Sequence, residues 1–442
     1  MEVSKKITQK VGIPDELNAI LKQEIVSIAT FNSVIQKYLA DASLTITRVI
    51  EIILAGSIIL DSSDIHIEPE ENIAKLRIRL DGVLQDVMTF DRKAYESILS
   101  RIKLLSEMKL NINDRPQDGR FSILVDKVSV EIRASIIPAE YGESIVMRLL
   151  NPKSLISLDE AGLRKDLYDT FMKEINRPNG MIIVTGPTGS GKTTTLYAFM
   201  KKISNPEIKI ITIEDPIEYH LNGISQTQVE PSKGYDFASG LRAIVRQDPD
   251  VILVGEIRDL ETVDIALQAA LTGHLVLSTL HTNDAAGTIA RLVSLGAKPF
   301  NIGPATNMAV AQRLVRRICT NCGALETPTA EEMAKIKESI EPAIPSLRQK
   351  GVELPDVNEN LKIYHAKGCD KCSNTGYRGR VGIYEAFFID NEMQKTILGD
   401  SSIVAMKEMA QKKGMLTMYQ DGLIKVLQGL TTIDEVERVA EK

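Results

Sequence analysis

The chain has 442 residues, and at about 150 residues per domain this length predicts about three domains. Hydrophobic residues make up 43% and charged residues 25%, which excludes a wholly disordered chain, a collagen-like chain and a disulfide-dense miniprotein. The net charge is −6, aromatic residues make up 5%, and Trp is absent. No nucleic-acid partner is therefore expected, because a nucleic-acid surface needs excess positive charge and aromatic stacking platforms.

Membrane-spanning and export signals are not expected. The most apolar stretch, residues 49–60, contains Glu51 and is shorter than the roughly 20 residues that a transmembrane helix needs. The N-terminus is basic, but the apolar stretch of a signal peptide does not follow it. We therefore expect a cytoplasmic protein that attaches to a membrane peripherally, through partners.

The N-terminal third begins with helical patterns. Residues 1–44 are predicted to form a short helical segment, because apolar residues recur at helical spacing after Pro14. An α+β domain is predicted over residues 45–150, and the apolar run 43–59 leads into it as a mostly buried helix.

Alternation of apolar and polar residues then predicts half-buried strands. The alternating runs lie at 65–68, 76–81, 121–125 and 128–136, with a further helix expected over 95–108. Asp81-Gly82 and Asp126-Lys127 are the predicted hairpin turns.

After a linker at residues 151–160, the pattern changes to short apolar runs separated by helix-like segments. The runs lie at 181–185, 209–213, 251–254 and 275–279. Buried strands that alternate with helices predict an α/β core over residues 161–311, with a mostly parallel sheet covered on both faces. Residues 312–385 carry the cysteines, and residues 386–442 are predicted to be a helical subdomain.

A phosphate-binding loop is predicted at GPTGSGKT, which fits G-x-x-x-x-G-K-[ST] between an apolar strand and a helix. Its glycines let backbone N–H groups face phosphates, and the helix N-terminus adds a favourable dipole. Lys192 would reach the β- and γ-phosphates, and the Thr193 hydroxyl would bind Mg²⁺. The predicted nucleotide-binding residues are Gly186, Pro187, Thr188, Gly189, Ser190, Gly191, Lys192, Thr193 and Thr194. The alternative is a glycine-rich turn with a coincidental lysine.

Two acidic residues follow predicted strands and are candidate catalytic groups. Glu256 follows the run 251–254, and Glu214 follows the run 209–213. Ligands of parallel sheets collect at the carboxyl ends of the strands, so both side chains could face the nucleotide. One would be the general base and the other would hold metal or water, and the sequence does not divide these roles.

His274 and His281 bracket the apolar run 275–279, so each is expected near one end of that strand. A sensor of the γ-phosphate and a pair of hydrogen-bonded structural histidines are both compatible with this spacing.

The four cysteines form two pairs, Cys319-x-x-Cys322 and Cys369-x-x-Cys372. Each pair is a compact thiolate clip, and two clips complete a closed tetrahedral site of the structural zinc type. Because the two pairs are far apart in the sequence, the segment between them is expected to extend away from the metal site and return to it. His365 lies in this segment and is a possible substitute ligand. Four free thiols and a redox pair are the alternatives.

The motifs GPTGSGKTTTLYA, ITIEDPIEY, RQDPDVILVGEIRD and TGHLVLSTLHTNDA, in this order, resemble those of the secretion ATPases. These are the hexameric motors of type II secretion and type IV pilus assembly. Further motifs of the chain are also similar to those of this family: SDIHIEP, RIRLDGVL, RPQDGRF, the paired CxxC and GYRGRVGIYE. The resemblance extends from about Leu44 to the C-terminus.

This resemblance implies a PAS-like α+β domain, then a RecA-like P-loop ATPase domain with a zinc-binding insertion and a C-terminal helical subdomain. It implies a homohexamer that uses ATP, Mg²⁺ and Zn²⁺. It also implies that arginines of the first domain reach the phosphates. The candidates are Arg120, Arg133 and Arg148, with Arg101 and Arg115 behind them. Ion pairs within the first domain are the alternative role for some of these arginines.

The function implied is ATP hydrolysis that powers pilin polymerisation or type II secretion, with residues 151–160 as the hinge. The partners implied are an inner-membrane platform protein and cytoplasmic docking proteins. The paired CxxC favours extension or secretion over pilus retraction, and the long spacing between the pairs favours pilus assembly. The alternatives are a RecA-like nucleic-acid-dependent motor, a DNA-uptake pseudopilus ATPase and a scaffold that binds nucleotide without turnover.

Overall fold

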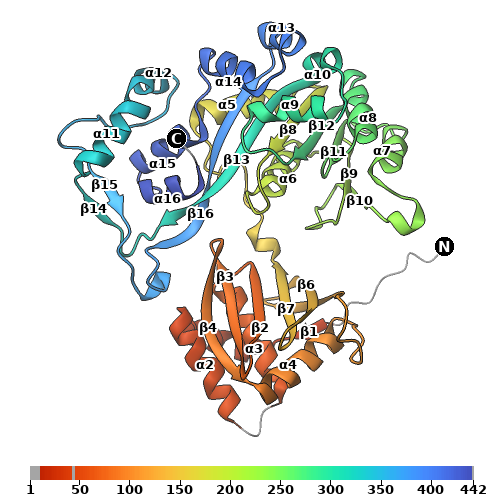
Figure 1. The fold of residues 1–442 in the computed structure, drawn as a ribbon, viewed down its shortest axis with the longest axis vertical. Coiled ribbons are helices and arrows are strands. Elements are labelled where there is room, and N and C mark those ends of the chain that lie inside the picture. Colours follow the sequence, from red (N-terminus) through yellow and green to blue (C-terminus); the bar gives the residue numbers. More distant parts are fainter. Residues whose placement is uncertain (1–9, 42–44, 441–442) are drawn as a thin grey trace. The chain divides into compact units, whose positions relative to one another are not determined.

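The computed structural model describes residues 10–41 and 45–440, which form parts of two compact units (Figure 1). Unit 1 comprises the chain up to Ser154 together with Cys319–Cys322 and Lys367–Arg378. Unit 2 comprises Leu155–Ile318, Gly323–Ala366 and Gly379–Lys442. None of the described helices combines the length and apolarity that crossing a bilayer requires.

Unit 1 contains a seven-stranded sheet in the order β1-β5-β6-β7-β2-β3-β4. The strands are β1 (Lys10–Gly12), β2 (Asp64–Pro69), β3 (Ile73–Leu80), β4 (Val83–Asp91), β5 (Gln117–Val125), β6 (Val128–Ala139) and β7 (Gly142–Leu150). Its helices are α1 (Asp15–Glu24), α2 (Ile28–Ala40), α3 (Ile46–Ile59) and α4 (Arg92–Leu105), and the short 3₁₀ helix η1 (Pro152–Ser154) follows β7. Every pair of neighbouring strands in this sheet is antiparallel except β1 with β5.

The two predicted hairpin turns of unit 1 are confirmed. Asp81 and Gly82 join β3 to β4 with φ of 49° and 86°, and Asp126 and Lys127 join β5 to β6 with φ of 53° and 62°. Two consecutive positive φ values twist the chain in the sense that the flanking strands require. The sequence prediction did not include β1, β4 and β7.

The N-terminal segment predicted at 1–44 shares a core with the sheet in unit 1. Leu21 of α1 and Phe31 of α2 are buried in the same hydrophobic cluster as Ile52 of α3. An added Cβ at Gly56 would lie 2.2 Å from the Phe31 ring, so α2 and α3 approach closely there. Residues 1–9 and 42–44 of the predicted segment lie outside the described residues.

Unit 2 contains a second seven-stranded sheet, in the order β10-β9-β11-β12-β8-β13-β16. Its strands are β8 (Gly180–Thr185), β9 (Ile210–Glu214), β10 (Ser225–Gln228), β11 (Val251–Val254), β12 (Leu275–Leu280), β13 (Thr306–Ile318) and β16 (Tyr377–Phe388), and β14 (Ala324–Glu326) pairs with β15 (Ile363–His365) separately. From β10 to β13 neighbouring strands are parallel, as predicted. The predicted boundaries at 311/312 and 385/386 fall inside β13 and β16.

Helices cover both faces of this sheet (Figure 1). The helices of unit 2 are α5 (Lys165–Ile175), α6 (Lys192–Ile203), α7 (Phe237–Val245), α8 (Leu260–Leu271), α9 (Ala286–Ser294), α10 (Pro299–Ala305), α11 (Ala330–Ser339), α12 (Ile344–Gln349), α13 (Asn391–Gly399), α14 (Ile403–Lys412), α15 (Met418–Leu427) and α16 (Ile433–Val439). The remaining 3₁₀ helices are η2 (Pro231–Lys233) and η3 (Glu341–Ala343) in unit 2 and η4 (Asp370–Cys372) in unit 1. Ile183 packs in the cluster of α7 and α8, whereas its neighbour Ile182 packs in the cluster of α5 and α6. Successive strand residues thus face opposite layers, which explains the continuous apolar runs.

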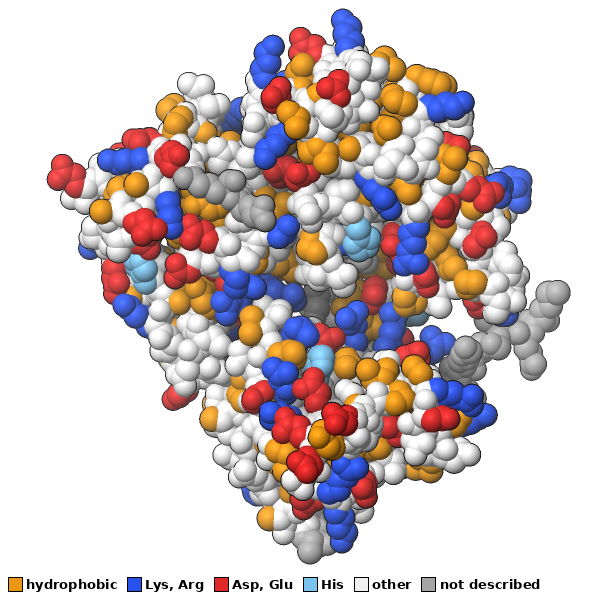
Figure 2. Space-filling view, in the orientation of Figure 1, with side chains coloured by type: hydrophobic (Ala, Val, Ile, Leu, Met, Phe, Trp, Pro, Cys, Tyr) orange, Lys and Arg blue, Asp and Glu red, His pale blue; other side chains and the backbone are white. Residues whose placement is uncertain are grey.

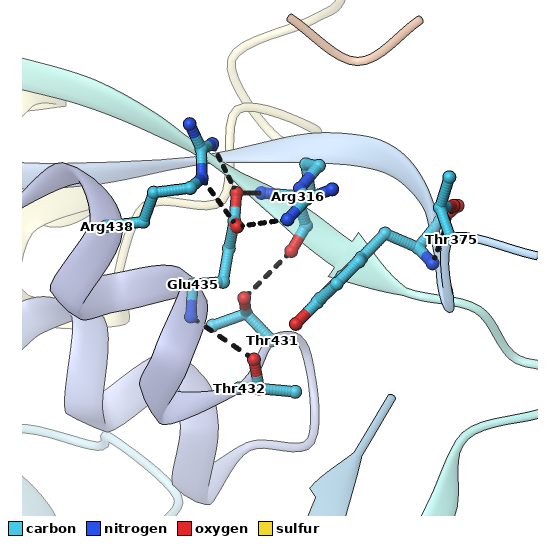
Figure 3. A network of polar contacts seen from close by, with 7 residues as sticks. Arg316, Thr375, Thr431, Thr432, Glu435 and Arg438 are labelled. Atoms are coloured by element: carbon cyan, nitrogen blue, oxygen red, sulfur yellow. Dashed lines mark hydrogen bonds and ion pairs between the residues drawn. The ribbon is translucent and has the colours of Figure 1, made fainter. Parts of the chain in front are cut away.

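A buried carboxylate of helix α16 binds strand β13 through hydrogen bonds (Figure 3). Glu435 of α16 accepts hydrogen bonds from the backbone N–H and a guanidinium nitrogen of Arg316, at 2.9 and 2.7 Å, and from Arg438. The Thr431 hydroxyl donates to the Arg316 carbonyl at 2.8 Å. These bonds compensate the cost of burying Glu435 and hold the end of β13 in place.

The surface carries both signs of charge. On the face shown in Figure 2, Lys and Arg side chains are interspersed with Asp and Glu side chains over each unit. Charged side chains of opposite sign are also paired at close range, such as Lys165 with Asp169 on α5 and Lys413 with Asp390. Exposed pairs of this kind contribute little to stability.

A buried ion pair in unit 1 gives a stability prediction. Lys103 Nζ lies 2.6 Å from Glu143 Oε2 and donates to the Ile112 carbonyl at 2.7 Å, and both charged side chains are buried. Glu143→Gln leaves a buried ammonium without its counter-ion, so we expect a loss of about 3–5 kcal/mol in urea unfolding followed by circular dichroism.

The matched control for this ion pair is Glu96→Gln, which removes an exposed pair with Arg92 and should change stability by less than about 1 kcal/mol. Replacing both buried partners, as Lys103→Met with Glu143→Leu, should recover most of the loss, because no unpaired charge remains. Equal losses for Glu143→Gln and Glu96→Gln would contradict this account.

Candidate active site

The predicted phosphate loop connects β8 to α6. Gly186, Gly189 and Gly191 have φ of 146°, 80° and 88°, a region that glycine enters without strain. A Cβ at Gly186 would lie 2.5 Å from the Gln312 carbonyl oxygen, and one at Gly191 would lie 2.8 Å from Gln312 Nε2. The first and third glycines of the loop therefore pack against the same residue of β13.

The remaining predicted loop residues divide between an exposed tip and the start of the helix. Pro187 and Thr188 are exposed, whereas Ser190 is buried. Thr193 and Thr194 lie in the first turn of α6 and are partly exposed. Backbone N–H groups of a first helical turn have no intrahelical acceptor, so this end of α6 can receive an anion.

Lys192 is folded back onto the loop. Its Nζ donates to the Gly186 carbonyl at 2.7 Å and to the Pro187 carbonyl at 3.1 Å. Burial lowers the pKa of Lys192, and the nearby Glu256 carboxylate partly opposes this effect. The ammonium group is thus held inside the loop, where phosphate oxygens could replace the carbonyl oxygens.

Glu256 and His281 lie at the same edge of the sheet as the loop. Glu256 follows β11 and is 15% exposed, and it pairs with Arg258. His281 follows β12, and its Nε2 lies 3.6 Å from Glu256 Oε2. Burial lowers the pKa of His281, and the positive charges of Lys192 and Arg258 lower it further. The Glu256 carboxylate acts in the opposite direction and raises this pKa, but the net effect is a lowering. The imidazole is therefore biased toward its neutral form.

The Thr185 hydroxyl fixes the backbone on both sides of His281. The Thr185 hydroxyl at the end of β8 donates to the Leu280 carbonyl at 3.0 Å and accepts from the Thr282 N–H at 2.8 Å. The segment that follows β12 is therefore bonded to the strand that leads into the phosphate loop.

His274 lies at the opposite edge of the sheet. It precedes β12, whose Leu275 is opposite Gly180, while Leu280 is opposite Thr185. A strand of this length separates the two edges by roughly 17 Å. His274 Nδ1 lies 3.0 Å from the Ala269 carbonyl oxygen, which matches the structural interpretation of this residue. Within this sheet, the fold brings His281 but not His274 to the phosphate loop.

Glu214 is buried at the end of β9, and protein groups bind both of its oxygens. Thr212 Oγ1 and Gln226 Nε2 donate to Oε1 at 2.6 and 3.1 Å, and the Tyr197 hydroxyl donates to Oε2. Burial, and then Glu214, raise the pKa of Tyr197, which therefore remains a donor. Glu214 is consequently less available to a water molecule than Glu256.

The candidate arginines belong to unit 1. Arg120, Arg133 and Arg148 lie directly opposite one another on β5, β6 and β7. Arg148 Nε lies 3.1 Å from Asp64 Oδ1, and Arg133 Nε lies 3.5 Å from Glu131 Oε1. Among the described residues, ion pairs within the unit thus exist for Arg133 and Arg148. Arg101 lies on α4, and Arg115 precedes β5.

The four cysteines come together in a single cluster that could hold a metal ion. Their sulfur atoms all lie within 4.8 Å of one another. Cys322 and Cys372 are 3.7 Å apart at sulfur, too far for a disulfide, and all four thiols are free. Among the described residues, His365 is outside this cluster, since its Nε2 lies 3.0 Å from Glu332.

Several residues that support the site were not predicted from the sequence. Arg258 pairs with Glu256, and Gln312 accepts a hydrogen bond from the Thr195 hydroxyl at 2.8 Å beneath the loop. Arg258 lies in the motif VGEIRD, which could have indicated it. Gln312 has no comparable local signal, because its place beside the loop depends on the pairing of β13 with β8.

The pKa of His281 provides a test of this geometry. Glu256→Gln removes a carboxylate that raises this pKa and leaves burial, Lys192 and Arg258, which lower it, so the pKa should fall further. The chain has five histidines, so imidazole NMR titration can follow this signal, with assignment by His281→Gln.

Glu261→Gln on α8, where the carboxylate pairs with Arg242, is the matched control and should leave the pKa of His281 unchanged. A rise in this pKa in Glu256→Gln would mean that Glu256 does not face the imidazole in solution.

The family described as "Type II/IV secretion system protein" matches residues 40–438. The type II secretion system ATPase E of Vibrio cholerae is 42% identical over 398 residues, which are 90% of this chain and 76% of that protein. The type IV pilus assembly ATPase PilB of Thermus thermophilus is 42% identical over 385 residues, 87% of this chain, but the chain spans only 42% of that relative's length.

Solved structures have the same fold. The pilus retraction motor PilT with bound ADP aligns with a TM-score of 0.58 at 27% identity, over 88% of this chain and 96% of that one. The ATPase DotB of Legionella pneumophila aligns with a TM-score of 0.62 at 23% identity, over 88% and 94%. The mixed α/β fold with its parallel sheet is therefore one that secretion and pilus ATPases adopt.

Proposed function

The chain belongs to the type II/IV secretion system protein family, and we propose that it is a motor ATPase that powers type IV pilus assembly or type II secretion. It hydrolyses ATP to ADP and phosphate. The observation that carries this proposal is the meeting of Lys192, Glu256 and His281 at one edge of a parallel sheet. A phosphate-binding cation, a carboxylate and an imidazole are the groups that phosphoryl transfer to water uses.

The phosphate loop would hold the nucleotide. Its backbone N–H groups bind phosphate oxygens, and Lys192 exchanges its contacts with loop carbonyls for the β- and γ-phosphates. Thr193 would hold Mg²⁺, which neutralises the charge that develops on the phosphate oxygens. Burial of Lys192 strengthens its attraction to phosphate, because less water screens the charge.

We assign two roles to Glu256: it orients the attacking water and accepts the proton of that water. It is partly exposed and faces Lys192, whereas Glu214 is buried with both oxygens hydrogen-bonded. Glu214 then serves mainly to fix the end of β9. His281, neutral at physiological pH, donates or accepts a hydrogen bond near the γ-phosphate. Arg120, Arg133 and Arg148 of unit 1 add charge to the phosphate site.

The cysteine cluster would hold zinc in a structural role. A tetrahedral site with Zn–S bonds of about 2.3 Å has sulfur atoms about 3.8 Å apart. Here Cys369 and Cys372 are 3.7 Å apart at sulfur, and Cys319 and Cys369 are 4.0 Å apart. The Gly376 N–H donates to Cys372 Sγ at 3.2 Å, a bond that suits a thiolate. Zn²⁺ would cross-link the two CxxC segments without an open position for chemistry.

The assembly proposed is a homohexamer on the inner face of the cytoplasmic membrane. Unit 1 would be the PAS-like domain and unit 2 the RecA-like ATPase domain. Residues 151–160 would form the hinge whose conformation changes with the bound nucleotide. A platform protein and cytoplasmic docking proteins would attach the ring to the membrane, and the spacing of the CxxC pairs favours pilus assembly.

ATP turnover tests the proposed function. The purified chain should hydrolyse ATP, and Glu256→Gln should bind ATP but lose at least about 100-fold in kcat, because the water loses its proton acceptor. Glu214→Gln should lose less, since its neighbours still hydrogen-bond the amide. Oligomer mass, read from the same samples by light scattering, should correspond to six chains.

The control for turnover is Glu261→Gln, an equally conservative change on α8, and it should retain wild-type turnover. If Glu256→Gln hydrolysed ATP at the wild-type rate, another residue would have to accept the proton of the attacking water. Absence of turnover in the wild-type chain would overturn the ATPase proposal.

Metal analysis tests the zinc proposal. The purified chain should carry one zinc ion per subunit, and Cys372→Ser should lose it, because a hydroxyl is a poor replacement for a thiolate. His365→Gln, which changes a nearby histidine outside the cluster, should keep the metal in full. Retention of zinc in Cys372→Ser, or its absence from the wild-type chain, would refute the cysteine site.

A further inference from the structure

A cavity in unit 2 lies beside the end of strand β16. Its volume is about 670 Å³, within the range of roughly 300–1,000 Å³ that is usual for ligand sites. Its walls come from the start of α5, the end of β16, the residue after α12, and the end of α14 with the segment that follows it. All of these segments belong to unit 2, and the cavity shares no lining residue with the nucleotide site.

The backbone of β16 has a defined outer edge, because β16 is the last strand of its sheet. Successive N–H groups of a strand point alternately to its two sides. The Ile389 N–H donates to the Asn307 carbonyl of β13 at 3.0 Å. The Tyr384 N–H points to the other side, where it donates to the buried Asp421 carboxylate at 2.8 Å. Even-numbered residues of this stretch therefore present their backbone groups to the outer edge.

Two of these residues face the cavity. Ala386 and Phe388 have the same backbone orientation as Tyr384, and both line the cavity. Among the residues that the structure describes, no further strand lies beyond β16 in this sheet. Outward N–H and C=O groups at a sheet edge are a template on which an extended peptide can pair.

The inner wall of the cavity is buried and offers apolar contacts. Phe387 and Met415 are buried lining residues, and Arg164 beside them is buried as well. Arg164 is held in place by Asp421, whose Oδ1 lies 2.7 Å from a guanidinium nitrogen. Asp421 thus binds both α5 and β16, which fixes two walls relative to one another. The cavity is therefore preformed, as ligand sites usually are.

Charge pairing along the lining leaves one ammonium group open. Each lining aspartate has a cationic partner: Asp166 pairs with Arg164, Asp169 with Lys165, and Asp390 with Lys413. Lys350, which follows α12, also lines the cavity, and within the described part of the chain it has no carboxylate at ion-pair distance. An acidic side chain of a ligand would complete the pairing at this position.

We propose that the outer edge of β16 at Ala386 and Phe388 binds an extended peptide segment of a partner protein, which joins the sheet as an additional strand. An acidic side chain of this segment pairs with Lys350, and its apolar side chains pack against Phe387 and Met415. A peptide matches the site because it supplies backbone donors and acceptors to the edge and side chains of both kinds to the walls. This site is separate from nucleotide hydrolysis and does not rest on it.

The probe is a phage-displayed library of random decapeptides, selected against the full chain. Peptides enriched by the wild-type chain should alternate apolar residues and carry Asp or Glu, and binding of a labelled synthetic copy is measured by fluorescence anisotropy. Lys350→Glu should weaken binding about tenfold, the value of one charge-assisted hydrogen bond. A peptide with Lys in place of its acidic residue should regain affinity for this variant.

Ala386→Pro tests the backbone pairing separately. Proline removes an N–H that points to the outer edge and leaves the bonds to β13, so binding should again weaken about tenfold. Thermal unfolding shows whether this variant is folded, and Lys350→Glu tests the site independently if it is not.

The matched control is Lys337→Glu, which changes an exposed lysine in the last turn of α11, outside the cavity, and should leave binding unchanged. Failure to enrich any peptide, or affinities that neither Lys350→Glu nor Ala386→Pro changes, would overturn the proposal. The oligomer mass of Lys350→Glu should equal that of the wild-type chain. A smaller mass would show that a second copy of the chain occupies this edge, which would also overturn the proposal.

Discussion

The parallel pairing of β8, β12 and β11 is the constraint on which the nucleotide site depends. Parallel strands end at the same edge of a sheet, so the segments that follow them must meet there. Gly186, Glu256 and His281 each follow one of these strands directly or at close distance. The Thr185 hydroxyl bonds to Thr282 and locks two of the strand ends together. The site is thus a consequence of sheet register.

The environment of each carboxylate determines what it can do. Glu214 and Glu256 both follow strands, but Tyr197, Thr212 and Gln226 bind both oxygens of Glu214. Glu256 keeps partial exposure and faces two cations and an imidazole. Full hydrogen bonding makes a buried carboxylate structural, whereas partial exposure leaves it available to water.

Strand β13 carries several of these functions on one element. It pairs with β8, places Gln312 against the phosphate loop, and binds α16 through Arg316. Cys319, the first metal-binding candidate, follows its last residue. Gly186 and Gly191 pack so closely against Gln312 that neither position has space for a side chain. The sequence does not mark Gln312, because its role arises only from its neighbours in space.

The sequence alone determined the local chemistry. The spacing of glycines around Lys192, the CxxC pairs and the turn at Asp81-Gly82 are contiguous signals, and the structure confirms the loop geometry, the cysteine cluster and the hairpin. Only the tertiary structure separated Glu214 from Glu256, paired β12 with β8 so that His281 lies beside the phosphate loop, and aligned Arg79 with Asp64. The physical reason is that these properties depend on strand order, register and burial. Such quantities relate residues far apart in the chain, and local periodicity does not encode them.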